Sequence, residues 1–131
     1  MGGYDLIKEG GGILNDRKRY GLALKVALYV EGNFSKKITL KSLSIQFCTN
    51  RTTLSSSFRE RYKVSVYKYL TKVRMDYARA KLVSNDFIGM DELAESSGYS
   101  DRNNFSTAFK RENGVCPISY MKLCNNIVDI K

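Results

Sequence analysis

The sequence has no histidine and only three cysteines among its 131 residues. Histidine is the side chain most often used as a general base and as a nitrogen ligand for metals, so its absence argues against most hydrolytic and metal-dependent chemistry. The cysteines, Cys48, Cys116 and Cys124, are odd in number and form no Cys-x-x-Cys pair. They support neither a disulfide framework nor a zinc site, and we expect them to be small buried side chains in a reducing compartment. We therefore predict no enzyme activity, no metal and no cofactor.

Long hydrophobic segments are also absent. The longest uninterrupted apolar run is five residues, Val26 to Val30, whereas a membrane-spanning helix needs about 20. The first residues lack the basic region followed by an apolar stretch that marks a secretory signal. We expect a cytoplasmic protein.

Acidic residues are outnumbered by basic ones. The chain has 22 Lys and Arg against 13 Asp and Glu, a net charge of +9, which predicts a polyanionic partner. The excess is uneven, because residues 17–81 carry a net charge of +13 and residues 82–131 carry −2. The N-terminal part should therefore supply most of the electrostatic attraction.

The positions of glycine and proline suggest where helices lie. Five of the ten glycines fall within the first twelve residues, which predicts a flexible leader over residues 1–16. Pro117 is the single proline, and alternation of apolar and polar side chains is almost absent. Apolar residues instead recur every three or four positions, beginning with a helix that starts near Tyr20 and ends near Gly32. We therefore predict an all-α chain of helices joined by short polar turns.

Two segments match after a shift of 51 residues, which indicates an internal duplication. The matching apolar pairs are Leu54 and Phe105, Phe58 and Phe109, Val64 and Val115, and Tyr69 and Tyr120. Each copy has the pattern of a short helix, a tight turn and a second helix. The predicted ranges are 39–47, 48–50 and 51–62 in the first copy, and 90–97, 98–100 and 101–113 in the second. Asn50 and Ser100 are the expected N-caps, because each side chain can accept a hydrogen bond from an unpaired amide.

A linking helix is predicted between the copies, over residues 65–83. Its apolar residues occupy two opposite faces, as in a helix packed between two bodies. The organisation expected from the sequence is a leader (1–16), a first helix-turn-helix lobe (17–64), the linking helix (65–83), a second lobe (84–124) and a C-terminal tail (125–131).

A helix-turn-helix places its second helix in the major groove of B-form DNA. Two such lobes in one chain imply two groove contacts. The linking helix is about 28 Å long at its predicted length, which is close to the spacing of about 34 Å between successive major-groove faces. We therefore expect one monomer to read two successive grooves of double-stranded DNA.

A set of short stretches carries a resemblance to a known family. They are Leu40 to Leu43, Leu54 to Arg59, Tyr69-Leu70, Arg74-Met75, Ala78, Leu82, Met90 to Ala94, Gly98 to Asp101, Phe105 to Lys110, and Gly114 to Pro117 followed by Tyr120. Together, from Ile38 to Tyr120, they resemble the DNA-binding domain of the AraC/XylS family of bacterial transcription regulators. The resemblance implies about seven helices, two helix-turn-helix lobes joined by a long central helix, and a role in switching transcription at promoters, with RNA polymerase as a further candidate partner.

Three positions depart from the family's pattern. Cys48 stands in the first turn where glycine is usual, so either the backbone angles differ or this residue is strained. Ser56 and Thr107 stand two residues before the core phenylalanines, where the family commonly has arginine. Because arginine can contact guanine through two hydrogen bonds, the first recognition helix should read sequence loosely, or depend on thymine methyls and phosphates.

Position along each helix separates candidates for base contact from candidates for phosphate contact. The base-contact candidates are Arg51, Thr52, Ser55, Ser56, Arg102, Asn103, Asn104 and Thr107. The phosphate-contact candidates are Lys36, Lys37, Lys41, Asn50, Arg59, Ser100, Lys110 and Arg111. Given the uneven charge, we expect the first lobe to supply most of the nonspecific affinity and the second most of the sequence choice.

Other function classes stay open. The chain could be a protein-interaction module or a nonspecific nucleic-acid-binding module that keeps the fold, because the two arginines are missing. RNA recognition is disfavoured, since the phenylalanines fall at core spacing. The acids Asp91, Glu92 and Glu95 fit a helix N-terminus better than a catalytic site, and Cys116 lacks the flanking histidine of a DNA-repair methyl acceptor. The residues before Ile38 are too few for an effector domain, so we expect a stand-alone regulator or a fragment.

Overall fold

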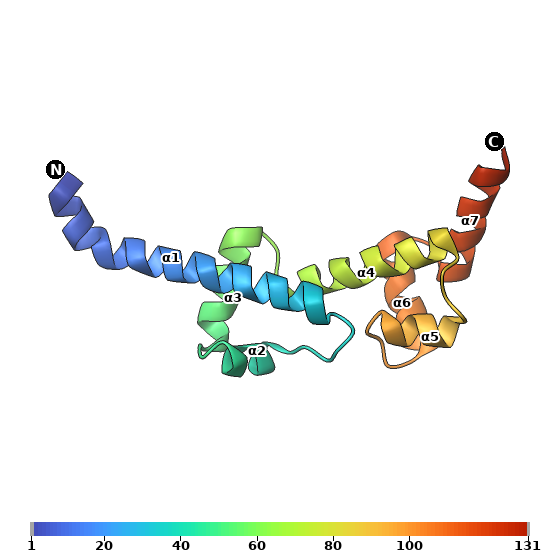
Figure 1. Cartoon of the computed structure of the whole chain (residues 1–131), viewed down its shortest axis with the longest axis horizontal. Coiled ribbons are helices and arrows are strands. Elements are labelled where there is room, and N and C mark those ends of the chain that lie inside the picture. Colours follow the sequence, from blue (N-terminus) through green and yellow to red (C-terminus); the bar gives the residue numbers. More distant parts are fainter. Residues whose placement is uncertain (1, 131) are drawn as a thin grey trace. The chain divides into compact units, whose positions relative to one another are not determined.

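The computed structural model describes the backbone of residues 2–130 and the side chains of residues 15–126. Over that range the chain forms seven α-helices and no strand (Figure 1), which confirms the predicted all-α class. Their bounds are α1 (Gly2–Asn33), α2 (Leu40–Gln46), α3 (Arg51–Tyr62), α4 (Val66–Ser84), α5 (Met90–Ser96), α6 (Arg102–Asn113) and α7 (Pro117–Ile130). In the described part of the chain, none of these helices is both long enough and apolar enough to cross a membrane.

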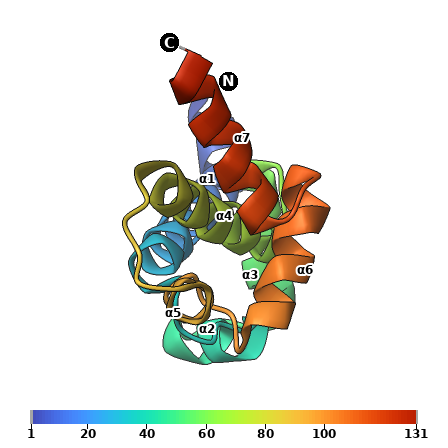
Figure 2. The ribbon, with the colours of Figure 1, turned by 90° about the vertical axis from the view of Figure 1, so that its right-hand side faces the viewer.

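The helices form two compact units. The first contains α1 as far as Gly32 and the segment Ile38–Leu70, hence α2, α3 and the start of α4. The second contains Asn33–Lys37 and the chain from Thr71 onward; Figure 2 shows its helices α5, α6 and α7 around the end of α4. Each unit holds one helix-turn-helix, α2 with α3 and α5 with α6. The duplication predicted from the 51-residue shift therefore corresponds to two structural repeats.

The core of the first unit joins α1, α3 and α4. Its fully buried α1 residues recur at helical spacing and are Ala23, Val26, Ala27 and Val30. Phe58 of α3 has no exposed surface, and its ring centroid lies 4.7 Å from that of Tyr62 and 5.3 Å from that of Tyr69. The Tyr69 hydroxyl donates a hydrogen bond to Glu31 of α1, and burial together with this carboxylate raises the pKa of Tyr69 to about 12. The contact ties α4 to α1.

The core of the second unit is built in the same way around Phe109. Its ring centroid lies 5.8 Å from that of Phe105 and 5.4 Å from that of Tyr120 on α7. The buried cluster comprises Met75, Ala78, Leu82, Leu93, Ala94, Phe105, Ala108 and Phe109. The pairs matched in the sequence thus include the central aromatic residue of each core.

Side chains cap the starts of α2, α3 and α6. Thr39 and Ser42 form a reciprocal capping box on α2, and the Asn50 side chain accepts the amide hydrogen of Thr53 at 2.7 Å on α3, as predicted. The predicted cap Ser100 is wrong by one residue, because α6 begins at Arg102 and Asp101 accepts the amide hydrogen of Asn104 at 2.8 Å.

Both ends of the chain differ from the expected boundaries. The structure continues α1 back to Gly2, so residues 2–16 have helical backbone where a leader was predicted. Helix propagation gains a hydrogen bond per residue once the packed segment is formed, and this outweighs the low helix propensity of glycine. Likewise α7 runs to Ile130, where a tail was predicted from residue 125.

The segment Asn33–Lys37 belongs to the second unit, although the sequence placed it in the first lobe. Arg74 of α4 holds it, with Nε donating to the Phe34 carbonyl at 2.8 Å and Nη2 to the Lys36 carbonyl at 3.0 Å. The Phe34 ring also packs against Tyr77 with centroids 5.0 Å apart. The guanidinium therefore satisfies carbonyls that follow the end of α1.

The two helix-turn-helix turns differ in their strain. Gly98 has φ +99°, and a Cβ built on it would lie 2.5 Å from Arg74 Nε and 2.6 Å from the Phe34 carbonyl oxygen. Cys48, at the matching position of the first turn, has φ 53° and carries a side chain in the left-handed region. Cys48 is also exposed, and Cys116 and Cys124 are half-buried, so the expectation of buried cysteines is wrong.

We predict that Gly98→Ala and Cys48→Ala will have unequal effects. Gly98→Ala forces a Cβ against Arg74 and adds positive-φ strain, so the unfolding free energy should fall by about 2 kcal/mol or more. Cys48→Ala only shortens an exposed side chain and should change it by less than about 0.5 kcal/mol. Urea denaturation followed by circular dichroism measures both, and similar losses would contradict the role of Gly98.

The cap of α6 gives a second prediction. Asp101→Ala should lower the unfolding free energy by about 1 kcal/mol, because it leaves the Asn104 amide without its acceptor. Ser100→Ala is the matched control and should have the smaller effect, since Ser100 accepts only from the Asn104 side chain. The same denaturation experiment measures both, and a larger loss for Ser100→Ala would restore the cap predicted from the sequence.

Candidate nucleic-acid interface

The outward face of α3 is polar and basic. Leu54, Ser57 and Phe58 are buried on one side of the helix, so the residues on its opposite side face outward. One open depression on that face is lined by Arg51, Thr52, Ser55, Ser56 and Arg59. All five are exposed except Ser55, which is half-buried. The four base-contact candidates of the first lobe therefore share one surface with the phosphate candidate Arg59.

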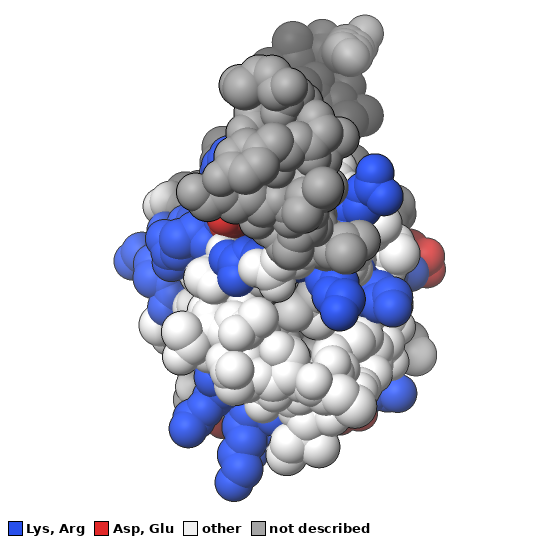
Figure 3. Space-filling model, turned by 90° about the vertical axis from the view of Figure 1, so that its left-hand side faces the viewer, with Lys and Arg blue, Asp and Glu red and all other residues white. Residues whose placement is uncertain are grey.

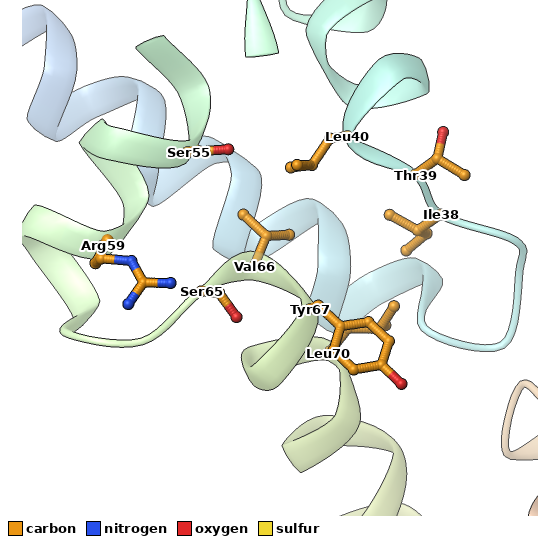
Figure 4. A pocket seen from close by; sticks show the side chains of 9 residues that line it. All are labelled: Ile38, Thr39, Leu40, Ser55, Arg59, Ser65, Val66, Tyr67 and Leu70. Carbon is orange, nitrogen blue, oxygen red and sulfur yellow. The ribbon is translucent and has the colours of Figure 1, made fainter. Parts of the chain in front are cut away.

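A pocket of about 330 Å³ lies beside this face, lined by residues of α2, α3 and the start of α4. Figure 4 shows Ile38, Leu40 and Val66 pointing toward one another across it, with Ser55 and Arg59 on the α3 side. Ser55 lines both the pocket and the open depression, which accounts for its partial burial. Within the described side chains no acid pairs with Arg59, so its guanidinium can meet an external anion.

Arg19 of α1 reaches the α3 surface, a contact that no pattern in the sequence predicts. Its Nη2 donates a hydrogen bond to Ser56 Oγ at 3.1 Å and lies 3.8 Å from a carboxylate oxygen of Glu60. A guanidinium thus stands beside Ser56, the position that is commonly arginine in the family that the sequence resembles. Arg19 was missed because its partners are 37 residues or more away in sequence.

The outward face of α6 carries two amides, an arginine and one hydroxyl. Phe105 and Phe109 have no exposed surface. The exposed residues opposite them are the predicted base-contact candidates Arg102, Asn103, Asn104 and Thr107. The Asn104 amide nitrogen donates to Ser100 Oγ at 2.7 Å, so Asn103 is the amide on this face without an intramolecular partner among the described side chains.

Arg102 is held by an acid from α5. Its Nε lies 3.1 Å from Asp91 Oδ1, and both side chains are more than half exposed. Asp91 and Glu92 occupy the first turn of α5, as expected for acids at a helix N-terminus. An exposed ion pair contributes about 0–1 kcal/mol, so Arg102 can exchange this partner for another at small cost.

The phosphate candidates are all exposed: Lys36, Lys37, Lys41, Asn50, Arg59, Ser100, Lys110 and Arg111. They differ in their intramolecular contacts. The Asn50 side chain is engaged as the α3 cap, and Arg111 Nε pairs with Glu112 at 3.1 Å. Lys36 and Lys37 lie in the second unit, on the segment held by Arg74, so the candidates expected in the first lobe are divided between the units.

Other chemistry finds little support in the described residues. They contain no group of three or more side chains arranged to hold a metal ion. Cys116 precedes α7, and hydrogen bonding with Ser119 lowers the pKa of its thiol. The Cys116 carbonyl accepts the amide hydrogen of Tyr120 at 2.9 Å. Cys116 therefore contributes to the first turn of α7.

Comparison with known sequences identifies a family and several relatives. Residues 43–123 match a family model described as a helix-turn-helix domain. An uncharacterised HTH-type transcriptional regulator of Bacillus subtilis, YisR, is 32% identical over 108 residues, which cover 82% of this chain and 37% of the relative. The raffinose operon transcriptional regulatory protein RafR of Pediococcus pentosaceus is 34% identical over 95 residues, covering 72% and 34%. The chain thus spans little more than a third of the length of these relatives.

Solved structures share the fold. The C-terminal domain of AraT, a response regulator from Geobacillus stearothermophilus, superposes with a TM-score of 0.74 and 31% identity, covering 78% of this chain and 84% of that one. The DNA-binding domain of the transcriptional factor AdpA, solved in complex with a target DNA, superposes with a TM-score of 0.71 at 20% identity, covering 77% and 90%. At that identity the second likeness concerns the fold alone.

Proposed function

Because the chain belongs to the AraC-type family of helix-turn-helix domains, which its residues 43–123 match, we propose that it binds double-stranded DNA and regulates transcription. The family resemblance predicted from Ile38 to Tyr120 is thereby confirmed. The observation that carries the proposal is that α3 and α6 each bury an apolar pair and expose polar residues on the opposite face. That is what a helix needs in order to enter a major groove.

In this proposal α3 and α6 are the recognition helices, and one monomer places them in successive major grooves. On α3 the contacts are cationic and hydroxyl groups, with Arg51, Thr52 and Ser56 toward bases and Arg59 toward phosphate. Hydroxyls discriminate bases less strongly than bidentate side chains do, so the first unit contributes mainly affinity.

The second unit contributes mainly sequence choice. Asn103 and Asn104 carry the amide group that pairs with the N6 and N7 edge of adenine. Arg102 exchanges its exposed contact with Asp91 for a guanine edge. Lys110 and Arg111, near the C-terminal end of α6, are placed for phosphates that fix the orientation of the helix.

The proposal also concerns where and with what the protein acts. A bacterial transcription regulator works in the cytoplasm, and RNA polymerase is the machinery whose activity it would alter. Relatives of the chain are transcription regulators, and we assign it no enzymatic reaction. A nonspecific or protein-binding role for the same fold is the outcome that the first experiment distinguishes.

The first experiment selects bound sequences from a pool of random duplexes. We expect enrichment of sites with two conserved blocks about one helical turn apart, because two helices entering successive grooves read separate half-sites. A single enriched block would indicate that only one of the two helices reads the DNA sequence. Binding without enrichment at low salt, lost at moderate salt, would indicate a nonspecific nucleic-acid module, and no binding would overturn the proposal.

The division of roles predicts different salt dependence for two variants. Arg59→Ala should lower the slope of log affinity against log salt by about one unit, because one phosphate contact is lost. Asn103→Ala should leave the slope unchanged and relax base preference at one position, at a cost of about 1–3 kcal/mol. Fluorescence anisotropy across a salt series on the selected duplex measures both. Equal slopes for the two variants would contradict the assignment.

A further inference from the structure

A second group of basic side chains lies in the first unit, on the part of α1 that precedes residues 43–123. Four basic side chains of α1, Arg17, Lys18, Arg19 and Lys25, line a cavity of about 560 Å³ against the turn between α2 and α3. None of the described residues lining that cavity is acidic. Figure 3 views this end of the molecule and shows Lys and Arg far outnumbering Asp and Glu on the described surface.

Three of these cations have no ion-pair or hydrogen-bond partner among the described residues. Arg17, Lys18 and Lys25 are exposed, and among the described residues none forms an ion pair or hydrogen bond with their side chains. Exposed lysines carry rotamer entropy and repel one another when they gather. Of the four cations that line the cavity, only Arg19 lies near a carboxylate, that of Glu60. The other three make the cavity suited to an anion.

The cavity adjoins the recognition face of α3. Its far wall is Cys48 and Thr49 of the turn together with Thr53 of the first turn of α3. Arg19 lines the cavity and also bonds to Ser56, which in turn lines the open depression on the outward face of α3. A single residue contact thus connects the basic cavity of α1 to the surface proposed to enter the groove.

We propose that residues 17–25 of α1 are a phosphate-binding platform that holds the backbone of the duplex flanking the groove entered by α3. The inference rests on the proposed function and deepens it, because it adds a contact that neither helix-turn-helix provides. Phosphodiester is the ligand class that fits, since repeated single negative charges match separate lysines and arginines along a strand. Arg19 acts as a positioning residue that keeps α1 against α3.

The test compares two single lysine variants of the full chain. Lys25→Gln removes a cation of the platform, and Lys122→Gln removes an exposed cation of α7 outside it. On the selected duplex, Lys25→Gln should reduce the salt slope by about 0.9 without altering base preference, and Lys18→Gln/Lys25→Gln by about twice that. Lys122→Gln should match the wild type. Circular dichroism verifies that each variant is folded.

Duplex length supplies an independent readout. Adding about six base pairs to the end of the site beside α3 should raise the affinity of the wild type and of Lys122→Gln, because the platform then has phosphates to hold. The gain should be largely lost in Lys18→Gln/Lys25→Gln. Equal gains in all three proteins, or equal salt slopes for Lys25→Gln and Lys122→Gln, would overturn the platform.

Competition with inorganic phosphate distinguishes DNA from a free anion as the ligand of the cavity. Inorganic phosphate, compared with chloride at equal ionic strength, should not weaken DNA binding beyond the general salt effect. Extra inhibition that disappears in Lys18→Gln/Lys25→Gln would assign the cavity to a free anion and overturn the assignment to DNA. If the wild type binds no duplex at all, the proposed function itself fails, whereas a wild type that binds with indistinguishable lysine variants refutes only the platform.

Discussion

The burial of one phenylalanine at the centre of each unit determines which face of the second helix is presented outward. Phe58 and Phe109 have no exposed surface and stand 51 residues apart. Removing such a side chain from a core costs about 3–5 kcal/mol. Rotating α3 by one residue, about 100°, would expose that ring and bury a polar neighbour such as Arg59, which adds the cost of desolvating a charge. The orientation of each outward face therefore follows from the core.

This coupling explains what could be predicted from the sequence. Burial of Leu54 with Phe58, and of Phe105 with Phe109, follows a helical period that the sequence displays directly, and the outward face of each helix lies opposite these pairs. The start of α6 was wrong by one residue for a local reason. Ser100 and Asp101 can both cap a helix, and the choice depends on the backbone at each, which composition does not reveal. In the structure Asp101 accepts a hydrogen bond from the backbone amide of Asn104, and Ser100 accepts one from the Asn104 side chain.

Features that depend on distant contacts could not be predicted. Arg74 meets the Phe34 carbonyl 40 residues away and so transfers Asn33–Lys37 to the second unit. Arg19 meets Ser56 at a separation of 37 residues. Neither arginine follows an apolar period, and on a helical pattern each reads as an ordinary solvated charge. The same limit applies to Gly98. A Cβ at this position would clash with Arg74, and only the structure shows that Arg74 lies beside it.

The uneven charge of the chain corresponds to a difference between the units in whether basic side chains have acidic partners. At physiological salt the screening length is about 8 Å, so a charge acts on what is next to it and the net charge of the whole chain decides little. In the second unit, Arg102 has Asp91 as a partner on the same surface, and the neutral amide of Asn103 stands beside it. In the first unit, Arg17 and Lys25 face a cavity without acids. Hydrogen bonds from amides lose little to added salt, whereas contacts between cations and phosphates release counterions and weaken steeply. Two repeats with the same core can therefore differ in what they contribute to a duplex, because the core determines only the orientation of the face and the surface residues determine its chemistry.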